Sequence, residues 1–424
     1  MLPNHSPISF EILHSPLHFL QAGLSDLPQP DWLREYESWW EREGQGISAA
    51  VDRSGTPWLR MFDRFGARVD EVLYPPEYWR MLKHGYHAGV LWRVFEEDSL
   101  LPAYLGIYVT SFYDPGLSCP YTVSLATIAP LSKYGDPELQ KRFLPPLLRR
   151  DESVWQGATW MTEIKGGSDL GAAVETVARP AGTHWLLTGD KYFASNAGAE
   201  LAVVAARPEG APRNVRGLGL YLVPRQRADG QLNYFIRRIK DKIATRSVPT
   251  GEIELRDSEA WLLGLREEGI YLILEVLNLS RVANSVGSVA LAQRAMADAL
   301  SFAKRRMVFG KPLIEQPLIR RQVPPSGPLG KVLDRRACSA NREVGHGNTR
   351  RTGYVGGVPR RALAARSDDS CYLGGDFASP DSRRLGSDGA QAHTSLAIPT
   401  PSSDWLRFSL ARNGIPGRTT TQPT

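Results

Sequence analysis

Hydrophobic residues in the first third of the chain recur at three- and four-residue intervals, which places them on one face of a helix. Four aromatic residues follow this spacing, namely Trp32, Tyr36, Trp39 and Trp40. Prolines mark further helix starts, because proline fits the first turn of a helix. On these grounds helices are predicted at Pro75–Pro76, from Pro120 through Ala126, and from Pro137, and the apolar stretch Leu101–Tyr113 predicts another. We therefore predict a helical domain over residues 1–152.

Between residues 153 and 258 the pattern changes to short apolar runs separated by Gly, Pro and Asn, which is typical of strands. Predicted strands are Ala202–Ala206, Gly219–Val223 and Gly251–Leu255. His184–Leu187 is a fourth, and we expect a turn directly after it, at Gly189 to Lys191. These runs predict a compact β-domain.

A long helix is predicted from Glu267 to about Phe302, since apolar residues recur there every three or four positions. Gly310 to Pro312 ends it, and a second helix is expected from Leu313 to Gln322. These two helices alone cannot bury their apolar faces, so residues 259–323 are predicted to be the start of an incomplete helical bundle. Four apolar side chains should then be exposed unless another chain covers them: Leu272, Val276, Leu279 and Val286.

The composition changes abruptly after Val323. Residues 324–424 hold 14 Lys and Arg against 8 Asp and Glu, a balance of +6 that equals the net charge of the whole chain. Only one of the 14 bases is a lysine, and Gly, Ser and Pro recur throughout. We predict a disordered tail, because such a composition buries too little apolar surface. An out-of-frame translation, a natural disordered tail and a nucleic-acid-binding segment are the three interpretations, and the abrupt boundary favours the first.

The composition of the whole chain excludes other classes. Hydrophobic residues make up 42 %, enough for sizeable cores. The longest apolar run, Leu201–Ala206, is far shorter than the roughly 20 residues of a membrane-spanning helix, so no membrane protein is expected. The first twenty residues lack the features of a secretory signal. Cys119, Cys338 and Cys371 form neither a disulfide framework nor a metal site, which predicts a cytoplasmic protein without a bound metal.

Three polar segments carry candidate chemistry. The first runs from Thr159 to Asp169 (TWMTEIKGGSD), the second from Gly189 to Asn196 (GDKYFASN), and the third from Arg306 to Lys311 (RMVFGK). Backbone N–H groups and hydroxyls of a glycine-rich turn such as Met161–Ser168 can donate hydrogen bonds to a ligand that carries negative charge. An ordinary β-turn is the alternative for that segment taken alone. Phe193 and Ser195, two apart on a strand, should share one face.

With the order helices, β-domain and long helix, these segments resemble the acyl-CoA dehydrogenase family. Four segments resemble its adaptive-response, AidB-like branch: Tyr36–Leu73 with the proline-rich helix start after it, Arg238–Ser247, Trp261–Gly264 and Phe309–Ile314. The resemblance covers residues 30–322. It implies an α+β fold with an N-terminal helical domain, a central β-barrel-like domain and a C-terminal helical bundle, truncated here and followed by the tail.

The resemblance implies FAD as cofactor and an acyl-CoA thioester as substrate, desaturated by hydride transfer to flavin N5. The cofactor-binding residues that it implies are Thr159, Trp160, Met161, Thr162, Gly167, Ser168, Phe193, Ala194, Ser195, Arg306, Val308, Phe309 and Gln316. The segment from Arg306 would meet the flavin of a neighbouring subunit, which implies a homo-oligomer, a dimer or a tetramer. Substrate contacts are implied for Ser168, Ser280 and Arg281. The electron acceptor is not identified.

No catalytic base can be assigned. The family carries a glutamate late in its last helical domain, or on the long helix directly before the arginine, and that second position is Ser280 here. The chain is therefore predicted to be an impaired oxidoreductase. The alternatives are a non-catalytic truncated or frame-shifted remnant, and a nucleic-acid-binding flavoprotein of the response to alkylation.

Overall fold

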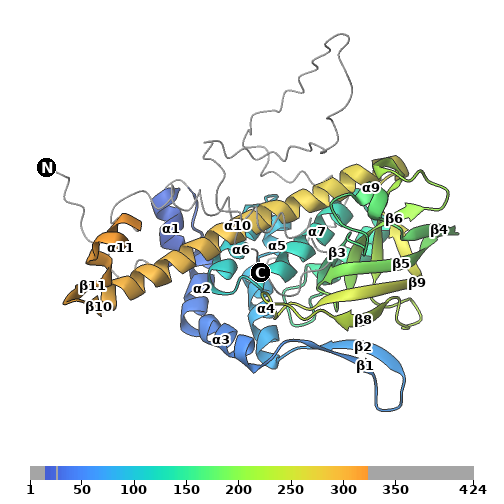
Figure 1. Ribbon diagram of the computed structural model, residues 1–424. Coiled ribbons are helices and arrows are strands. Elements are labelled where there is room, and N and C mark those ends of the chain that lie inside the picture. Colours follow the sequence, from blue (N-terminus) through green and yellow to red (C-terminus); the bar gives the residue numbers. More distant parts are fainter. Residues whose placement is uncertain (1–14, 25–26, 323–424) are drawn as a thin grey trace, which may run out of the picture.

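The computed structural model describes residues 15–24 and 27–322, and the predicted tail lies outside them. A helical part and a β-barrel lie side by side, and one long helix extends along both (Figure 1). The helices of the first part are α1 (Pro16–Gly23), α2 (Asp31–Trp39), the π-helical η2 (Trp40–Gly44), α3 (Gln45–Ser54), α4 (Pro76–Ala88), α5 (Trp92–Glu96), α6 (Leu101–Tyr113), α7 (Ser118–Tyr134) and α8 (Pro137–Leu147).

The aromatic face predicted near the start of the chain packs into the helical core. Tyr36, Trp39 and Trp40 are buried. The π-helical turn begins at Trp40, directly after Trp39. An added Cβ at Gly44 would lie 2.4 Å from the Trp40 ring, so only glycine leaves room for the indole. His84 of α4 stacks on Trp39, with ring centroids 4.0 Å apart.

His84 makes stability depend on pH. Burial lowers its pKa from 6.5 to about 4, so between these values the unfolded chain takes up a proton that the folded chain does not. Stability is therefore lost as pH falls through this window, by about 1–2 kcal/mol once solvent screening of a half-buried ring is allowed for. His84→Phe, which keeps a stacking ring, should remove that loss when urea unfolding is measured at pH 7 and pH 4.5. An equal loss in both proteins would contradict this assignment, and the pH 7 values report any change in packing.

The helical prediction for residues 31–150 is wrong at one place, where β1 (Trp58–Phe62) and β2 (Arg68–Leu73) form a hairpin. Its turn is closed by the Asp63 carboxylate, which accepts the N–H groups of Phe65 and Ala67, and by Gly66 at φ +86°. Figure 1 shows this hairpin reaching from the helical part to β8 (Phe235–Ile239) of the barrel. Burial alternates along β1, as expected of a strand covered on one side.

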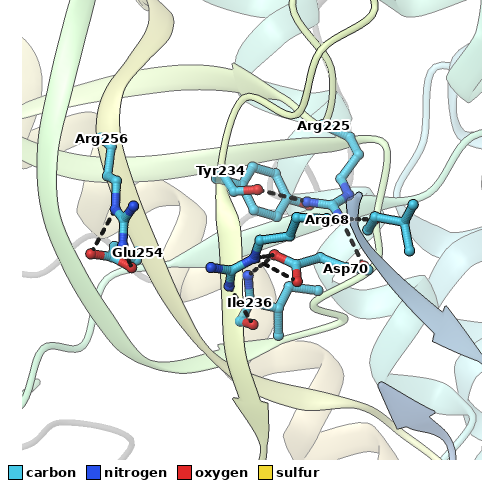
Figure 2. A network of polar contacts seen from close by, with 8 residues as sticks. Arg68, Asp70, Arg225, Tyr234, Ile236, Glu254 and Arg256 are labelled. Carbon is cyan, nitrogen blue, oxygen red and sulfur yellow. Dashed lines mark hydrogen bonds and ion pairs between the residues drawn. The ribbon is translucent and has the colours of Figure 1, made fainter. Parts of the chain in front are cut away.

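A buried carboxylate fastens the hairpin to the barrel (Figure 2). Asp70 accepts from Nε of Arg68 at 3.0 Å and from the N–H of Ile236 in β8 at 2.8 Å. Arg225 donates to the carbonyl of Asp70 at 2.7 Å and to that of Tyr234 at 2.9 Å. The Asp70 side chain is fully buried, and its backbone has φ +42°, a conformation that aspartate and asparagine tolerate.

Asp70→Ala is expected to lower the free energy of unfolding by about 2–3 kcal/mol, because it leaves the Ile236 N–H and a largely buried guanidinium without their acceptor. Urea unfolding measures the loss. Asp70→Asn keeps the left-handed backbone and one acceptor, so it should lose less. Glu71→Ala removes the exposed Arg60–Glu71 pair of the same hairpin and is the control; an equal effect at positions 70 and 71 would contradict the prediction.

The β-domain is a closed barrel. Its strands are β3 (Gly157–Trp160), β4 (Val177–Ala181), β5 (His184–Ser195), β6 (Leu201–Pro208), β7 (Gly219–Pro224), β8 (Phe235–Ile239) and β9 (Thr250–Leu262). Five strands form the ring in the order β6, β4, β5, β9 and β7, and pairing of β7 with β6 closes it. Two further strands lie outside the ring: β3 pairs with β6, and β8 pairs with β9. The predicted barrel-like domain is thus confirmed.

The predicted turn at Gly189 to Lys191 is wrong, since β5 continues to Ser195. Pairing with β9 holds the strand extended on both sides of Gly189. Glycine is needed here because the strand passes close to Thr176. At φ +151°, an added Cβ would lie 2.6 Å from the Thr176 hydroxyl oxygen.

The long helix α10 spans Gly269–Arg305, close to its predicted bounds. The two-residue strands β10 (Met307–Val308) and β11 (Lys311–Pro312) form a hairpin after it, and α11 (Pro317–Gln322) follows. The expected exposure of its apolar face is wrong: Leu272, Val276 and Leu279 are buried and Val286 is half-buried, because this face of α10 joins the core of the helical part. The exposed apolar side chains of α10 are instead Tyr271, Leu274, Val282, Leu291 and Phe302. Within the described residues, no helix combines the length and apolar character needed to cross a membrane.

Candidate functional site

The glycine-rich segment forms a tight turn directly after β3. Glu163 and Gly166 exchange backbone hydrogen bonds of 3.0 and 3.1 Å. Gly167 then passes so close to Thr162 that an added Cβ would lie 2.4 Å from the threonine hydroxyl oxygen. Within the described residues, neither the hydroxyls of Thr162 and Ser168 nor the N–H groups of Gly167 and Ser168 have a hydrogen-bond partner. The turn therefore offers a group of free donors.

Three contacts join this turn to the end of β5. The Trp160 indole N–H donates to the carbonyl of Ser195 at 3.1 Å, and the N–H of Tyr192 donates to the carbonyl of Thr162 at 2.9 Å. The second contact exists because β5 bulges between Lys191 and Ala194, which releases the Tyr192 N–H from the ladder with β9. The third is an ion pair between Glu163 and Lys191.

The Glu163–Lys191 pair is almost completely buried. The lysine Nζ lies 2.6 Å from Oε1 of Glu163 and 2.7 Å from the carbonyl of Ala205, and its side chain has no exposed surface. Glu163 also accepts from the Thr176 hydroxyl at 2.6 Å and from the N–H of Glu175 at 2.6 Å. Burial lowers the pKa of Lys191, and the nearby carboxylate opposes that shift. Such a pair holds its two segments at a fixed distance, because either charge alone would be costly.

The structure thus brings the first two sequence segments together, but not every residue in them faces outward. The side chains of Trp160 and Ala194 lie in the barrel core, and Met161 lies in the core of the helical part. Thr159, Thr162, Gly167, Phe193 and Ser195 are half-buried, and Ser168 is exposed. The ammonium of Lys240 lies 4.8 Å from the centre of the Phe193 ring. Only these exposed and half-buried groups can touch a ligand with their side chains.

The third segment lies elsewhere. Arg306, Val308, Phe309 and Gln316 belong to the hairpin region at the C-terminal end of α10, whereas the barrel lies beside the other end (Figure 1). At about 1.5 Å per residue the 37 residues of α10 are roughly 55 Å long. Within one chain the two parts therefore cannot touch the same small molecule.

The hairpin tip is strongly exposed. Phe309 is 94 % exposed and has φ +51°, followed by Gly310 at φ +76°. The Gln316 side-chain amide donates to the carbonyl of Val308 at 2.8 Å, so it ties the residues after the hairpin to its first strand. Arg306 is exposed and has no ion pair among the described residues. The tip is shaped to project a ring and a cation away from the chain.

The two residues implied for substrate contact lie in the middle of α10. Ser280 is half-buried, while Arg281 is exposed and donates to Oδ1 of Asn278 at 2.9 Å. Because Arg281 is exposed, its charge on this otherwise apolar helix carries no burial cost.

Sequence reasoning missed the structural roles of Glu163, Lys191 and Lys242. The sequence carried little signal for the pair, because Lys191 follows the charged Asp190 and lies where a turn was predicted. Lys242 follows β8 and contacts Thr250, the cross-strand neighbour of Ser195. In residues 15–24 and 27–322, no group of three or more His, Cys, Asp or Glu side chains is placed to hold a metal ion.

Comparison with known families assigns all three parts of the chain. The AidB N-terminal domain family matches residues 29–152, the acyl-CoA dehydrogenase middle domain matches 158–258, and the acyl-CoA dehydrogenase C-terminal domain matches 267–324. The putative acyl-CoA dehydrogenase AidB of Escherichia coli is 33 % identical over 282 residues, 62 % of this chain and 50 % of that protein. The chain spans about half the length of the curated relatives it matches.

Two solved structures share the fold. Caenorhabditis elegans ACDH-11 in complex with C11-CoA superposes with a TM-score of 0.67 at 24 % identity, over 82 % of this chain and 62 % of that one. Bacillus anthracis acyl-CoA dehydrogenase complexed with FAD gives a TM-score of 0.59 at 22 % identity, over 76 % and 51 %. From the matched domains and their order, the chain belongs to the acyl-CoA dehydrogenase family of oxidoreductases, with an N-terminal domain of the AidB type.

Proposed function

We propose that the chain binds FAD on the turn that follows β3 and on the end of β5. The observation that carries this proposal is the free donors of Thr162, Gly167 and Ser168, held beside Phe193 and Ser195 by the buried Glu163–Lys191 pair. Reduced flavin gathers negative charge at N1 and O2, and donors already fixed in place stabilise that charge. The flavin ring would lie against Phe193, and the Ser195 hydroxyl would donate to N5.

A second copy of the chain completes the proposed site. Arg306 and Phe309 lie at the far end of α10 from the turn, so a flavin on one chain can meet them only in a partner. A guanidinium suits a pyrophosphate because their charges are opposite. Its planar group can also donate two parallel N–H hydrogen bonds to phosphate oxygens. The proposed assembly is therefore a homo-oligomer, and its FAD affinity should fall on dilution.

The proposed reaction is α,β-desaturation of an acyl-CoA thioester, in which FAD accepts a hydride. Arg281 and the exposed hydroxyl of Ser168 would orient the thioester, and Ser280 occupies a position from which a general base acts in some relatives. The serine hydroxyl is neutral and cannot accept the α-proton as a carboxylate would. Proton removal is therefore the step that this chain supports least. We therefore propose a flavoprotein of low turnover.

The first experiment is titration of the purified full chain with FAD, followed by flavin fluorescence and visible absorbance. We expect binding in the micromolar range or weaker where the oligomer dissociates, since each charge-assisted phosphate contact that the partner supplies is then lost, at a cost of about 1.5–3 kcal/mol. Gly167→Val should abolish it, because its Cβ would enter the space of the Thr162 hydroxyl, while Gly46→Val in the helix α3, where nothing lies within 4 Å of an added Cβ, is the control. Absence of binding by the unaltered chain contradicts the proposal and leaves the non-catalytic remnant as the interpretation.

The second experiment adds acyl-CoAs of different chain length to the FAD-loaded protein without oxygen and follows bleaching of the flavin. Slow, acyl-CoA-dependent bleaching is expected. Flavin that never bleaches would contradict the proposed substrate class. Retention on DNA that weakens with rising salt would favour the nucleic-acid-binding alternative.

A further inference from the structure

A short chain of polar groups leads from the end of β5 to a lysine that the proposed site does not yet use. Ser195 and Thr250 are direct partners in the ladder between β5 and β9, and their hydroxyl oxygens are 3.2 Å apart. The ammonium of Lys242 lies 3.0 Å from the Thr250 hydroxyl oxygen and 2.8 Å from the carbonyl of Val248. Thr250 is only 2 % exposed.

Lys242 has an unusual environment for a lysine. It is half-buried in the loop between β8 and β9, and no carboxylate among the described residues forms an ion pair with it. Its remaining contact is with the Thr245 hydroxyl at 3.4 Å. Burial lowers its pKa. Because loops usually leave lysines in water, a charge kept inside without a counter-charge calls for a role.

The direction of the hydrogen bonds follows from the donors available. An ammonium has only donors, so Thr250 must accept from Lys242. The buried Thr250 hydroxyl hydrogen then needs an acceptor, and within the described residues the structure provides one, the hydroxyl oxygen of Ser195. Since Ser195 accepts this bond, its own hydrogen is free to point away from Thr250. Lys242 thereby determines which way the Ser195 hydroxyl donates.

We propose that Lys242 is a positioning residue, which acts through Thr250 to hold the Ser195 hydroxyl as a donor toward flavin N5. This inference rests on the proposed FAD site. It adds that the lysine's positive charge lies two hydrogen bonds from the Ser195 hydroxyl, and a positive charge near the flavin ring favours the reduced flavin, which is the more negative form. Neither effect requires Lys242 to touch substrate or cofactor.

The test compares the FAD-loaded full chain with Lys242→Met, Lys242→Arg and Thr250→Val. The readouts are the visible spectrum of bound FAD and its two-electron reduction equilibrium against a reference dye. Lys242→Met should shift that equilibrium toward oxidised flavin by about tenfold, which is ~30 mV for two electrons. Thr250→Val keeps the charge but breaks the relay, so it should alter the spectrum with a smaller shift. Lys242→Arg keeps charge and donors and should restore most of the unaltered behaviour.

Arg246→Met is the matched control, because Arg246 lies in the same loop but pairs with Asp52, away from Thr250. Bound FAD with the same spectrum and potential in Lys242→Met and Arg246→Met overturns the role of Lys242 while leaving the FAD site intact. If the unaltered chain binds no FAD, both the site and the relay are overturned. If Lys242→Met fails to fold, Thr250→Val decides: an unchanged spectrum in that variant overturns the relay.

Discussion

Lys191→Met is expected to lower the free energy of unfolding by about 3–5 kcal/mol, since it leaves the buried Glu163 carboxylate without its counter-charge. The same change removes one of the three contacts that join the turn after β3 to β5, so FAD affinity should fall with it. Urea unfolding measures the first effect, and flavin fluorescence at a urea concentration where the variant is still folded measures the second.

Lys165→Met is the matched control. Lys165 lies two residues after Glu163, in the same turn. The substitution breaks the Lys165–Glu175 pair, whose side chains are 61 % and 45 % exposed, and should cost about 0–1 kcal/mol. The double variant Glu163→Gln with Lys191→Met should recover part of the loss, because no unpaired charge remains. Equal stability of Lys191→Met and Lys165→Met would show that the buried pair does not hold the site together.

Ser280→Glu is expected to raise the rate of flavin bleaching by acyl-CoA about 10²–10⁴-fold, the usual contribution of a positioned general base. The prediction rests on the proposed reaction and on the place of Ser280 directly before Arg281 on α10. A half-buried position raises a carboxyl pKa through partial desolvation, which brings the group closer to the basicity needed for a weakly acidic proton. Anaerobic rapid-mixing spectrophotometry provides the measurement.

Asn284→Glu adds the same charge one turn further along α10, at an exposed position. It should leave the rate unchanged, because an exposed carboxylate is solvated and lies about 5–6 Å along the helix from position 280. A Ser280→Glu rate no higher than that of Asn284→Glu would exclude this position as the place for a base.

Several elements were predictable because their patterns are local and long. The period of α10 persists for ten turns, and the proline-started helices α4, α6 and α8 match their predicted starts. The segments from Thr159 and from Gly189 identified the candidate site through residue types alone. The hairpin β1–β2 was missed, since its short strands carry exposed and covered residues without a strong apolar run.

Spacing along the chain cannot reveal which polar side chains meet in space. Lys191 and Glu163 are 28 residues apart and pair because β5 passes the turn that follows β3. Gly189 resembles a turn residue but makes room for Thr176, a contact that only the packed barrel creates. Likewise, the apolar face of α10 is buried against helices from the first part of the chain, so its exposure could not be judged from its own sequence.

The sequence by itself therefore determined the order of the helical and β parts, the family and the residue types of the segments proposed to bind FAD, because hydrophobic periodicity and local motifs depend only on the order of residues along the chain. Tertiary structure decided which of these residues share one site. It joined the first two segments through a buried ion pair and a strand bulge, and it placed the Arg306 segment at the other end of a rigid helix. The reason is physical: a charge pair or a hydrogen bond depends on distances that only the folded chain sets.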